Sequence, residues 1–189
     1  MGIGLVHFEN DFTTLLKFYD RPDDSSVPVF SANLIYDSTE VGIKTTLKKE
    51  GELKFRPLYT LIGRSVAVLR VMHREGEWLR VVTDEISQTE HWLRSPESSI
   101  ESWPDFLKSV YHVGPKQADE NPLRKSPGNG EVLLERFDIT CFSITQVQED
   151  WIRVLNEPDN CDGPLISSYP YAGFLRWKKN GRVLINFAL

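Results

Sequence analysis

Two stretches of the chain decide its fold: EGEWLRVVTDEISQTEHWLR at residues 75–94 and QEDWIRVLNEP at residues 148–158. Each places charged residues directly before a Trp, an aliphatic residue, Arg and Val. With an offset of 73 residues, VAVLRVMHREGEWLRVV at 66–82 aligns without a gap on ITCFSITQVQEDWIRVL at 139–155. Two alternating runs joined by a short polar turn are typical of a β-hairpin. The sequence therefore predicts the same hairpin twice.

The similarity continues on both sides of the hairpins. Before them, LKFYDRPDDSS at 16–26 is similar to NPLRKSPGNGE at 121–131, because each has a short run, a Pro and a Gly, Asp or Ser turn. After them, EHWLRS at 90–95 is similar to GFLRW at 173–177. We therefore expect two copies of one unit, each larger than a hairpin.

These paired segments resemble the bacterial SH3-like (SH3b) domains. The family pattern is an opening strand with a Pro-containing turn, a hairpin ending in Trp-aliphatic-x-Val, and a strand of the Gly-Trp type. The chain departs from the pattern at His91, which replaces Gly, and at Phe174, which replaces Trp. The resemblance implies a mainly β fold with two small SH3-like β-barrels in tandem. Their expected boundaries and insertions are residues 1–97 with an insertion near 27–63, and residues 119–189 with an insertion near 158–172.

A helical connector is expected between the barrels, at residues 98–118. Ser98 or Ser99, followed by Glu101 or Ser102, offers helix-start chemistry; Pro104 suits a first turn, and Gly114-Pro115 is a stop signal. Apolar residues recur at helical spacing and form one stripe: Ile100, Trp103, Phe106, Leu107 and Val110. Two placements remain open for this short helix, a cleft between the barrels or a position on the first barrel alone.

Alternation divides the two tryptophan-led runs between two faces, because successive side chains of a strand point to opposite sides. The aliphatic residue and the Val of each run share a face that we expect to be core: Leu79, Val81, Ile152 and Val154. The Trp and Arg of each run share the other face: Trp78, Arg80, Trp151 and Arg153. This second face is either an aromatic platform for a ligand or the place where a Trp caps a barrel with a thin core.

Further binding candidates lie in the insertions, since loops on a rigid scaffold vary without disturbing the core. Tyr169, Tyr171 and Trp177 occur close together beside Pro170, and Tyr36 lies in the other insertion. Aromatic side chains with a polar edge favour recognition of peptides, sugar rings or proline-rich segments. The predicted ligand-binding residues are Tyr169, Tyr171, Trp177, Tyr36, Trp78 and Trp151. The alternative is an ordered loop sealed by its own aromatics, with Trp177 pointing inward.

The sequence carries no pattern for catalysis, for a cofactor or for a metal. It lacks a phosphate-binding Gly loop, a dinucleotide fingerprint, a nucleophile elbow and zinc-ligand spacing. We therefore expect a protein that is not an enzyme. A remote alternative is a cysteine hydrolase, because DNCDG around Cys161 faintly resembles the nucleophile turn of bacterial cell-wall cysteine peptidases. Those enzymes use a His after the Cys, and here all four His precede Cys161. Cys141 and Cys161 do not make a disulfide framework, and two free thiols are favoured over a pair.

The net charge of −5 argues against nonspecific binding to nucleic acid. The basic run RWKKNGR at 176–182 is either a local patch or a solvated hairpin turn. No apolar run approaches the ~20 residues of a membrane span, so membrane insertion is not expected. The start MGIGLVHFENDF lacks the features of a signal peptide. We expect a cytoplasmic protein if residue 1 is the native start; otherwise the compartment is open.

The expected function is noncatalytic recognition of a peptide, a cell-wall fragment or a protein partner through exposed aromatic side chains. This expectation rests on the fold-level resemblance and on the aromatic composition. The rival hypothesis is a small acidic intracellular protein, of the immunity or regulatory kind, that masks a basic surface of its partner. The net charge favours this rival through electrostatic steering.

Overall fold

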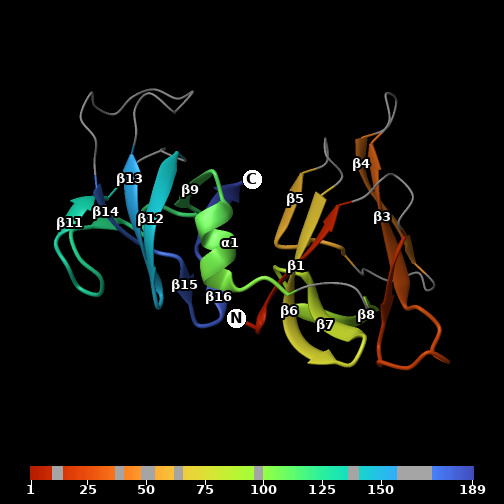
Figure 1. The fold of residues 1–189 in the computed structure, drawn as a ribbon. Coiled ribbons are helices and arrows are strands. Elements are labelled where there is room, and N and C mark those ends of the chain that lie inside the picture. The colour runs from red at the N-terminus through yellow and green to blue at the C-terminus, as the bar shows by residue number, and fades with distance from the viewer. Residues whose placement is uncertain are drawn as a thin grey trace. The chain divides into compact units, whose positions relative to one another are not determined.

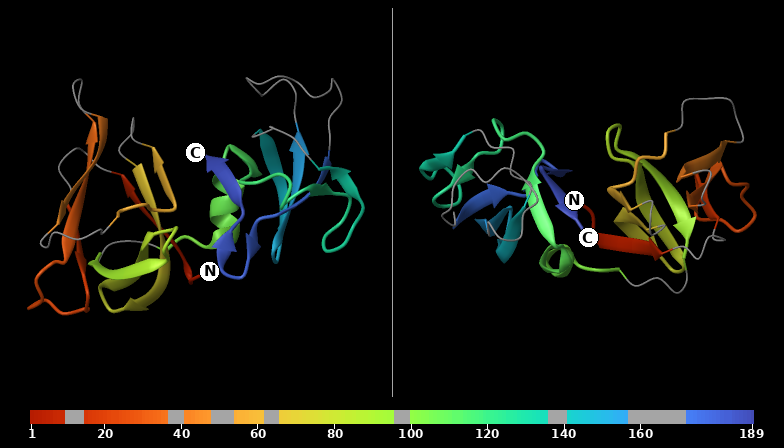
Figure 2. Two further views of the ribbon diagram at one scale, coloured as in Figure 1. Left: turned by 180° about the vertical axis from the view of Figure 1, so that it is seen from behind. Right: turned by 90° about the horizontal axis from the view of Figure 1, so that it is seen from above.

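The computed structural model describes the following residues: 1–9, 15–36, 41–47, 54–61, 66–95, 100–135, 141–156 and 172–189. The fold is mainly β, with curled antiparallel sheets that include a half-barrel, and one short helix. The chain divides into two compact units, Met1–Ser102 and Trp103–Leu189. Figures 1 and 2 show a curled sheet in each unit.

The first unit contains one sheet of eight strands: β1 (Gly4–Glu9), β2 (Leu16–Tyr19), β3 (Phe30–Tyr36), β4 (Val41–Leu47), β5 (Tyr59–Leu61), β6 (Val66–Glu75), β7 (Trp78–Asp84) and β8 (Thr89–Arg94). Their order is β1-β6-β7-β8-β2-β3-β4, and β5 pairs with β6 as well. Leu5 exchanges two backbone hydrogen bonds with Glu101, each of 2.9 Å. The end of the first unit is thereby fastened to its first strand.

The second unit contains a sheet of seven strands, a separate hairpin and the helix: α1 (Trp103–Ser109), β9 (His112–Pro115), β10 (Leu123–Arg124), β11 (Val132–Leu134), β12 (Phe142–Gln148), β13 (Trp151–Asn156), β14 (Ala172–Arg176), β15 (Lys178–Lys179), β16 (Arg182–Val183) and β17 (Ile185–Ala188). The sheet order is β11-β10-β14-β13-β12-β9-β17, and β15 pairs with β16.

Six strands of each unit are arranged in the same order. In the first sheet this order is β1-β6-β7-β8-β2-β3, and in the second it is β9-β12-β13-β14-β10-β11. The corresponding strands also follow one another along the chain in the same sequence, except that β4 and β5 come between β3 and β6. Both extra strands lie within residues 27–63, which sequence comparison identified as additional chain. The two tryptophan-led runs lie in separate sheets.

The pairing register agrees as well. Val71 lies opposite Val81 in the first hairpin, and Ile144 lies opposite Val154 in the second, which are the positions related by the offset of 73. Directly after each of these pairs the register shifts by a β-bulge or a similar irregularity. A bulge bends a strand and increases its twist, so both hairpins depart from regular pairing at the same place.

The core of each sheet is formed by the face that alternation predicted. Leu79, Val81, Ile152 and Val154 are completely buried, which confirms the face assignment. Burying a Val or Leu side chain contributes about 1.5–3 kcal/mol. The core of the first unit is completed by residues from five further strands and from the segment before β5: Val6, Leu16, Phe18, Phe30, Ala32, Phe55, Leu69, Val71 and Leu93.

The helical region differs from the expected connector. The helix covers only Trp103–Ser109, and Gly114-Pro115 lies in β9 instead of ending a helix. Ile100 precedes the helix and packs against the core of the first unit. The Trp103 ring lies 5.1 Å from that of Trp177, and the Phe106 ring lies 5.1 Å from that of Phe187. Placement on the first barrel alone is therefore wrong, because the helix packs within the second unit.

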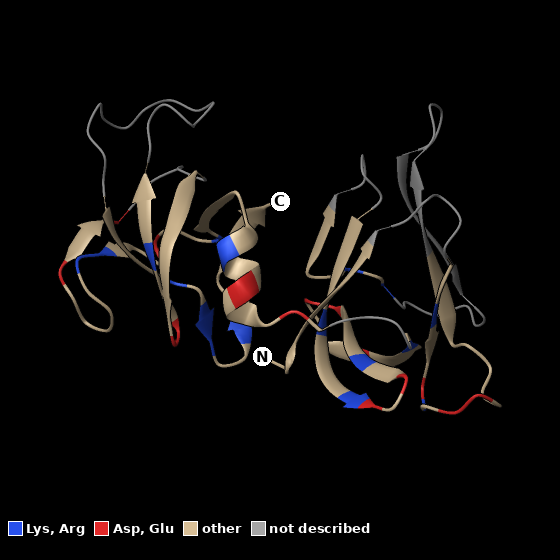
Figure 3. Ribbon diagram, viewed as in Figure 1, with Lys and Arg blue, Asp and Glu red and all other residues tan. Residues whose placement is uncertain are grey.

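Residues 178–182 of the basic run lie in the hairpin of β15 and β16, which is largely blue in Figure 3, and Arg176 ends β14. Asn180 and Gly181, both with positive φ, form its turn, as a tight two-residue hairpin requires. The solvated-hairpin interpretation is therefore confirmed. Across the described ranges, no helix combines the length and the apolar character needed to cross a membrane.

Candidate binding faces of the two sheets

The faces opposite the cores carry a repeated set of aromatic and arginine side chains. We call the first set the first quartet: Trp78, Arg80, Trp92 and Arg94. We call the second set the second quartet: Trp151, Arg153, Phe174 and Arg176. In each quartet the Trp of the first strand lies opposite an Arg, and its Arg lies opposite an aromatic residue. The two quartets therefore have one arrangement, with cationic and aromatic side chains alternating along and across the strands.

In the first quartet both arginines are occupied by carboxylates of the same unit. Arg80 Nε lies 3.1 Å from Glu90 Oε2. Arg94 Nη2 lies 2.7 Å from Glu77 Oε2, and its Nη1 lies 3.2 Å from Asp24 Oδ1. These contacts are at the surface, where an ion pair contributes about 0–1 kcal/mol. Their main consequence is that the two cations are neutralised locally.

The aromatic side chains of the first quartet lie within a larger aromatic face. Tyr19 packs edge-on against Trp78 at 5.2 Å between ring centroids, and His73 packs edge-on against Trp92 at 6.0 Å. Trp78 is only 9% exposed, whereas Trp92 is partly exposed. Trp78 therefore mainly supports this face, and Trp92, which the sequence comparison did not assign to the ligand site, offers more accessible surface.

In the second quartet, Arg176 is held beside Trp151. The Arg176 guanidinium carbon lies 5.8 Å from the centroid of the Trp151 ring, and Arg176 Nη2 lies 3.1 Å from Asp150 Oδ2. The buried Asn121 fixes the backbone of the same Arg, because its amide nitrogen donates to the Arg176 carbonyl at 2.9 Å and its oxygen accepts from the Arg176 N–H at 3.0 Å. An amide side chain thus replaces strand pairing just before Pro122, which has no N–H to donate.

The other predicted ligand residues have different outcomes. Trp177 is 2% exposed, and its indole nitrogen donates to the Glu149 carbonyl at 2.8 Å. Trp177 is therefore a core residue and does not line an exposed groove. Burial of its large apolar ring outweighs a surface position once the one polar group has a partner. Tyr169 and Tyr171 lie outside the described residues, as does the side chain of Tyr36, which lies in β3.

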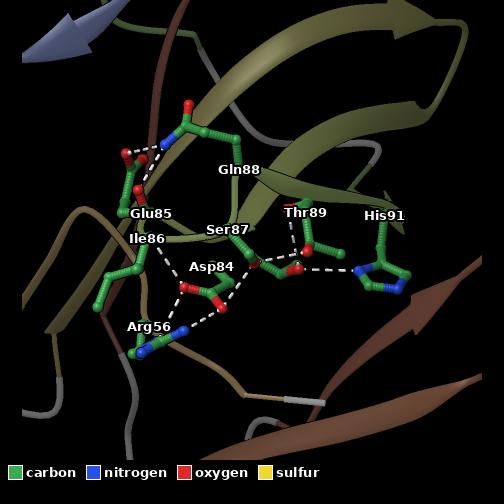
Figure 4. A network of polar contacts seen from close by, with 9 residues as sticks. Arg56, Asp84, Glu85, Ile86, Ser87, Gln88, Thr89 and His91 are labelled. Atoms are coloured by element: carbon green, nitrogen blue, oxygen red, sulfur yellow. Dashed lines mark hydrogen bonds and ion pairs between the residues drawn. The ribbon is translucent and has the colours of Figure 1, made fainter. Parts of the chain in front are cut away.

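The first unit also contains a polar network that fastens the turn between β7 and β8 (Figure 4). Asp84 accepts hydrogen bonds from Nε and Nη2 of Arg56, from Ser87 Oγ at 2.7 Å and from the Ile86 N–H at 2.9 Å. The hydrogen bonds from Arg56 hold the pKa of the Asp84 carboxyl well below its ordinary value, against the opposing effect of burial. The carboxylate is therefore charged at neutral pH and holds the segment before β5 against β7.

The buried Arg70 forms the second half of this network. Its side chain is 1% exposed, and its Nε donates to Glu85 Oε1 at 2.6 Å. Gln88 accepts a hydrogen bond from the same guanidinium and donates to the Glu85 backbone carbonyl at 2.5 Å. A buried cation is tolerated only when its donors are paired. The polar residues of the turn thus satisfy an arginine that lies within the apolar part of β6, residues 66–72.

Thr83 and His91 form a hydroxyl–imidazole pair whose geometry resembles that of an activated hydroxyl. Thr83 Oγ1 lies 2.8 Å from His91 Nδ1, and the His91 ring packs edge-on against Phe30 at 5.1 Å. Thr83 is 1% exposed and His91 is 7% exposed. A substrate cannot reach a pair that is buried in this way, so its role is structural.

The described residues bring together no group of three or more His, Cys, Asp or Glu side chains able to hold a metal. Cys161, on which the cysteine-hydrolase alternative depends, lies outside the described residues.

The residue pattern of the sequence did not indicate that Arg70 and Asp84 belong to one network. The signal for Arg70 is a single cation within the apolar run VAVLRVM, which requires a buried partner.

Comparisons with protein-family models, with curated proteins and with solved structures find no match to this chain.

Proposed function

We propose that this chain is a noncatalytic binding protein built from two tandem SH3-like barrels. It recognises a peptide, a cell-wall fragment or a protein partner through the aromatic side chains on the outer faces of its sheets. The barrel assignment is supported by the residue pattern and by six strands with one order in both units. The cell-wall fragment is included because of the resemblance to bacterial SH3-like domains.

The single observation that carries this proposal is the repeated quartet. The core requires only that the inward residues be apolar, and surface positions away from it are free to vary. Even so, both units place an aromatic residue and an Arg at the same outward positions in the same register. Trp, Tyr and Arg are the side chains in which binding energy concentrates. A shared binding role explains the outward pattern more directly than packing does.

The proposal is tested with the full chain labelled with nitrogen-15, in which the five Trp give separate indole N–H signals. The probes are a soluble digest of bacterial peptidoglycan and a proline-rich decapeptide. We expect the indole signals of Trp92 and Trp151 to move with at least one probe, and those of the buried Trp103 and Trp177 to stay in place. Movement of the buried pair alone, or of none of the five with either probe, would contradict the proposal for these ligand classes.

A second function is favoured by the uneven charge of the chain. Residues 1–102 contain twelve Lys and Arg against sixteen Asp and Glu, a net charge of −4, whereas residues 103–189 contain ten against eleven, a net charge of −1. An acidic unit attracts basic partners through long-range steering. Binding to a basic partner would then weaken steeply with salt and be insensitive to loss of Trp92 or Trp151, the reverse of the behaviour expected for aromatic recognition.

A further inference from the structure

We propose that Arg153 is the receptor for a carboxylate of the ligand, and that the ligand of the second unit is an acidic peptide segment. The carboxylate would contact the Arg153 guanidinium, and apolar neighbours in the peptide would lie on Trp151 and Phe174. This inference rests on the proposed binding function, for which it names one ligand chemistry and one of the two faces.

The first unit shows how a carboxylate occupies the corresponding position. Arg80 corresponds to Arg153, and its guanidinium is paired with the carboxylate of Glu90 on β8. Glu90 lies opposite Val82, and the corresponding pair in the second unit is Ala172 opposite Leu155. The second unit therefore has a methyl group where the first has the carboxylate that neutralises its Arg.

Arg153 is correspondingly open. Its side chain is exposed and forms no ion pair or side-chain hydrogen bond with any residue that the structure describes. The other three quartet arginines each pair with a carboxylate of their own unit: Arg80, Arg94 and Arg176. A guanidinium presents a planar fork of donors that matches a carboxylate. Arg153 is thus the quartet position where an external carboxylate meets no internal competitor within the described residues.

The neighbours of Arg153 favour a carboxylate on a partly apolar chain over a polyanion. Phe174 lies directly opposite Arg153 on β14, and Trp151 lies two residues earlier on the same face of β13. Both aromatic side chains are partly exposed. A polyanion such as a nucleic acid needs a clustered cationic surface, whereas the described part of this face offers Arg153 between two aromatic rings. Arg124, opposite Phe174 on β10, already donates to the Gly130 carbonyl at 2.9 Å. A Glu or Asp flanked by apolar residues matches that arrangement.

The test uses the full chain and two capped pentapeptides, one with a central glutamate between two tyrosines and one with a central glutamine instead. Binding is followed by the indole N–H signal of Trp151, assigned with Trp151→Phe. We expect the glutamate peptide to bind at least about 10-fold more tightly, because a hydrogen bond to a charged group contributes more than a neutral one. Equal affinities would overturn the carboxylate inference and leave aromatic recognition standing. No binding of either peptide would overturn the acidic-peptide assignment, while the peptidoglycan and proline-rich probes still test the general function.

Two substitutions test the difference between the units, by adding a carboxylate beside Arg153 or by removing the one beside Arg80. Ala172→Glu supplies the second unit with the internal carboxylate, and we expect it to lower the affinity for the glutamate peptide by about 10-fold or more. The matched control Ala172→Gln should change this affinity by less than about 3-fold. Glu90→Ala opens Arg80, and we expect a new response of the Trp92 indole signal to the same peptide. If Ala172→Glu and Ala172→Gln weaken binding equally, a steric effect explains the loss and the receptor role of Arg153 is wrong.

Discussion

The two units share an order of strands but differ in how they treat the polar positions next to their cores. The first unit buries Arg70 and His91; Glu85 of the turn after β7 pairs with Arg70, and Thr83 of β7 contacts His91. At the corresponding places the second unit has Ser143 and Gly173, and a Cβ added to Gly173 would lie 2.7 Å from Leu123 Cγ and 2.8 Å from the Arg124 carbonyl oxygen. One unit thus joins its strands through polar side chains, and the other through close backbone approach.

This difference shows which residues determine the topology. The inward apolar residues correspond in both units, and so do the strand order and the register shift after Val71 and Ile144. The polar residues at the strand ends do not correspond. Apolar patterning therefore suffices to specify the shared arrangement of strands, and the polar network is a feature added to the first unit.

The largest expected effect comes from breaking that network. Removing one partner of a buried ion pair costs about 3–5 kcal/mol, because the other charge is left uncompensated. We therefore expect Arg70→Ala to lower the free energy of unfolding of the first unit by about 3 kcal/mol or more. Residue-resolved amide hydrogen exchange measures each unit separately in the full chain.

Ser143→Ala is the matched control at the corresponding position of the second unit. A change away from a buried network costs about 0.5 kcal/mol or less. Similar losses for Arg70→Ala and Ser143→Ala would show that the network does not stabilise the first unit.

The next effect tests whether the two cores are equivalent. Val154→Ala removes completely buried methyl groups and should lower the stability of the second unit by about 1–3 kcal/mol. Arg153→Ala, one residue earlier on the exposed face, should change it by about 0.5 kcal/mol or less. Val81→Ala and Arg80→Ala should repeat this contrast in the first unit. Urea denaturation followed by hydrogen exchange measures all four variants, and equal losses for the members of either pair would reverse the face assignment.

The sequence alone predicts the strands of both hairpins and which of their faces is buried. Alternation around Trp78 and Trp151 predicts the strands and the buried face, because a period of two is a strong local signal. The repeat in the sequence also aligns Trp92 with Phe174, and these residues occupy corresponding places opposite Arg80 and Arg153. These predictions depend only on residues that are close in sequence or related by the repeat.

Other features depend on contacts that no local pattern contains. The helix ends at Ser109, because the next residues pair with β12 and β17 as strand β9. Trp177 is buried because Glu149 accepts its indole N–H from another turn. Arg56 reaches Asp84 across 28 positions of sequence. Tertiary context overrides local preference in each case, so the sequence alone could not predict them.

A smaller expected effect is that the stability of the first unit depends on pH through His91, whereas the second unit has Gly173 at this position. Burial lowers the pKa of the His91 imidazole, although Asp20 partly opposes this shift. Between that lowered pKa and the ordinary value of about 6.5, the unfolded first unit binds more protons than the folded one. Its stability is therefore present above about pH 6.5 and falls as the pH decreases through this window.

His91→Gln removes the titrating group while keeping a polar side chain for Thr83. We expect the stability of this variant to depend less steeply on pH below about 6.5 than that of the parent chain. Hydrogen exchange of the second unit, which has Gly173 at this position, serves as the internal reference. If the parent and His91→Gln show the same pH slope for the first unit, the buried imidazole does not contribute.

The smallest effect concerns the two hairpin turns. Their first residues correspond, and both have positive φ: Gly76 at 57° and Glu149 at 42°. A left-handed conformation costs a residue with a Cβ about 1 kcal/mol, so the second turn carries a cost that the first avoids. We expect Glu149→Gly to stabilise the second unit by about 0.5–1 kcal/mol, and Gly76→Ala to destabilise the first unit by a similar amount.

No heavy atom lies within 4 Å of a Cβ added at Gly76, so the loss would come from the backbone conformation and not from a clash. Glu149 accepts the Trp177 indole N–H through its backbone carbonyl, which glycine retains. Thermal unfolding of both variants checks the prediction, and a loss of stability in Glu149→Gly would show that the glutamate side chain itself supports the second turn.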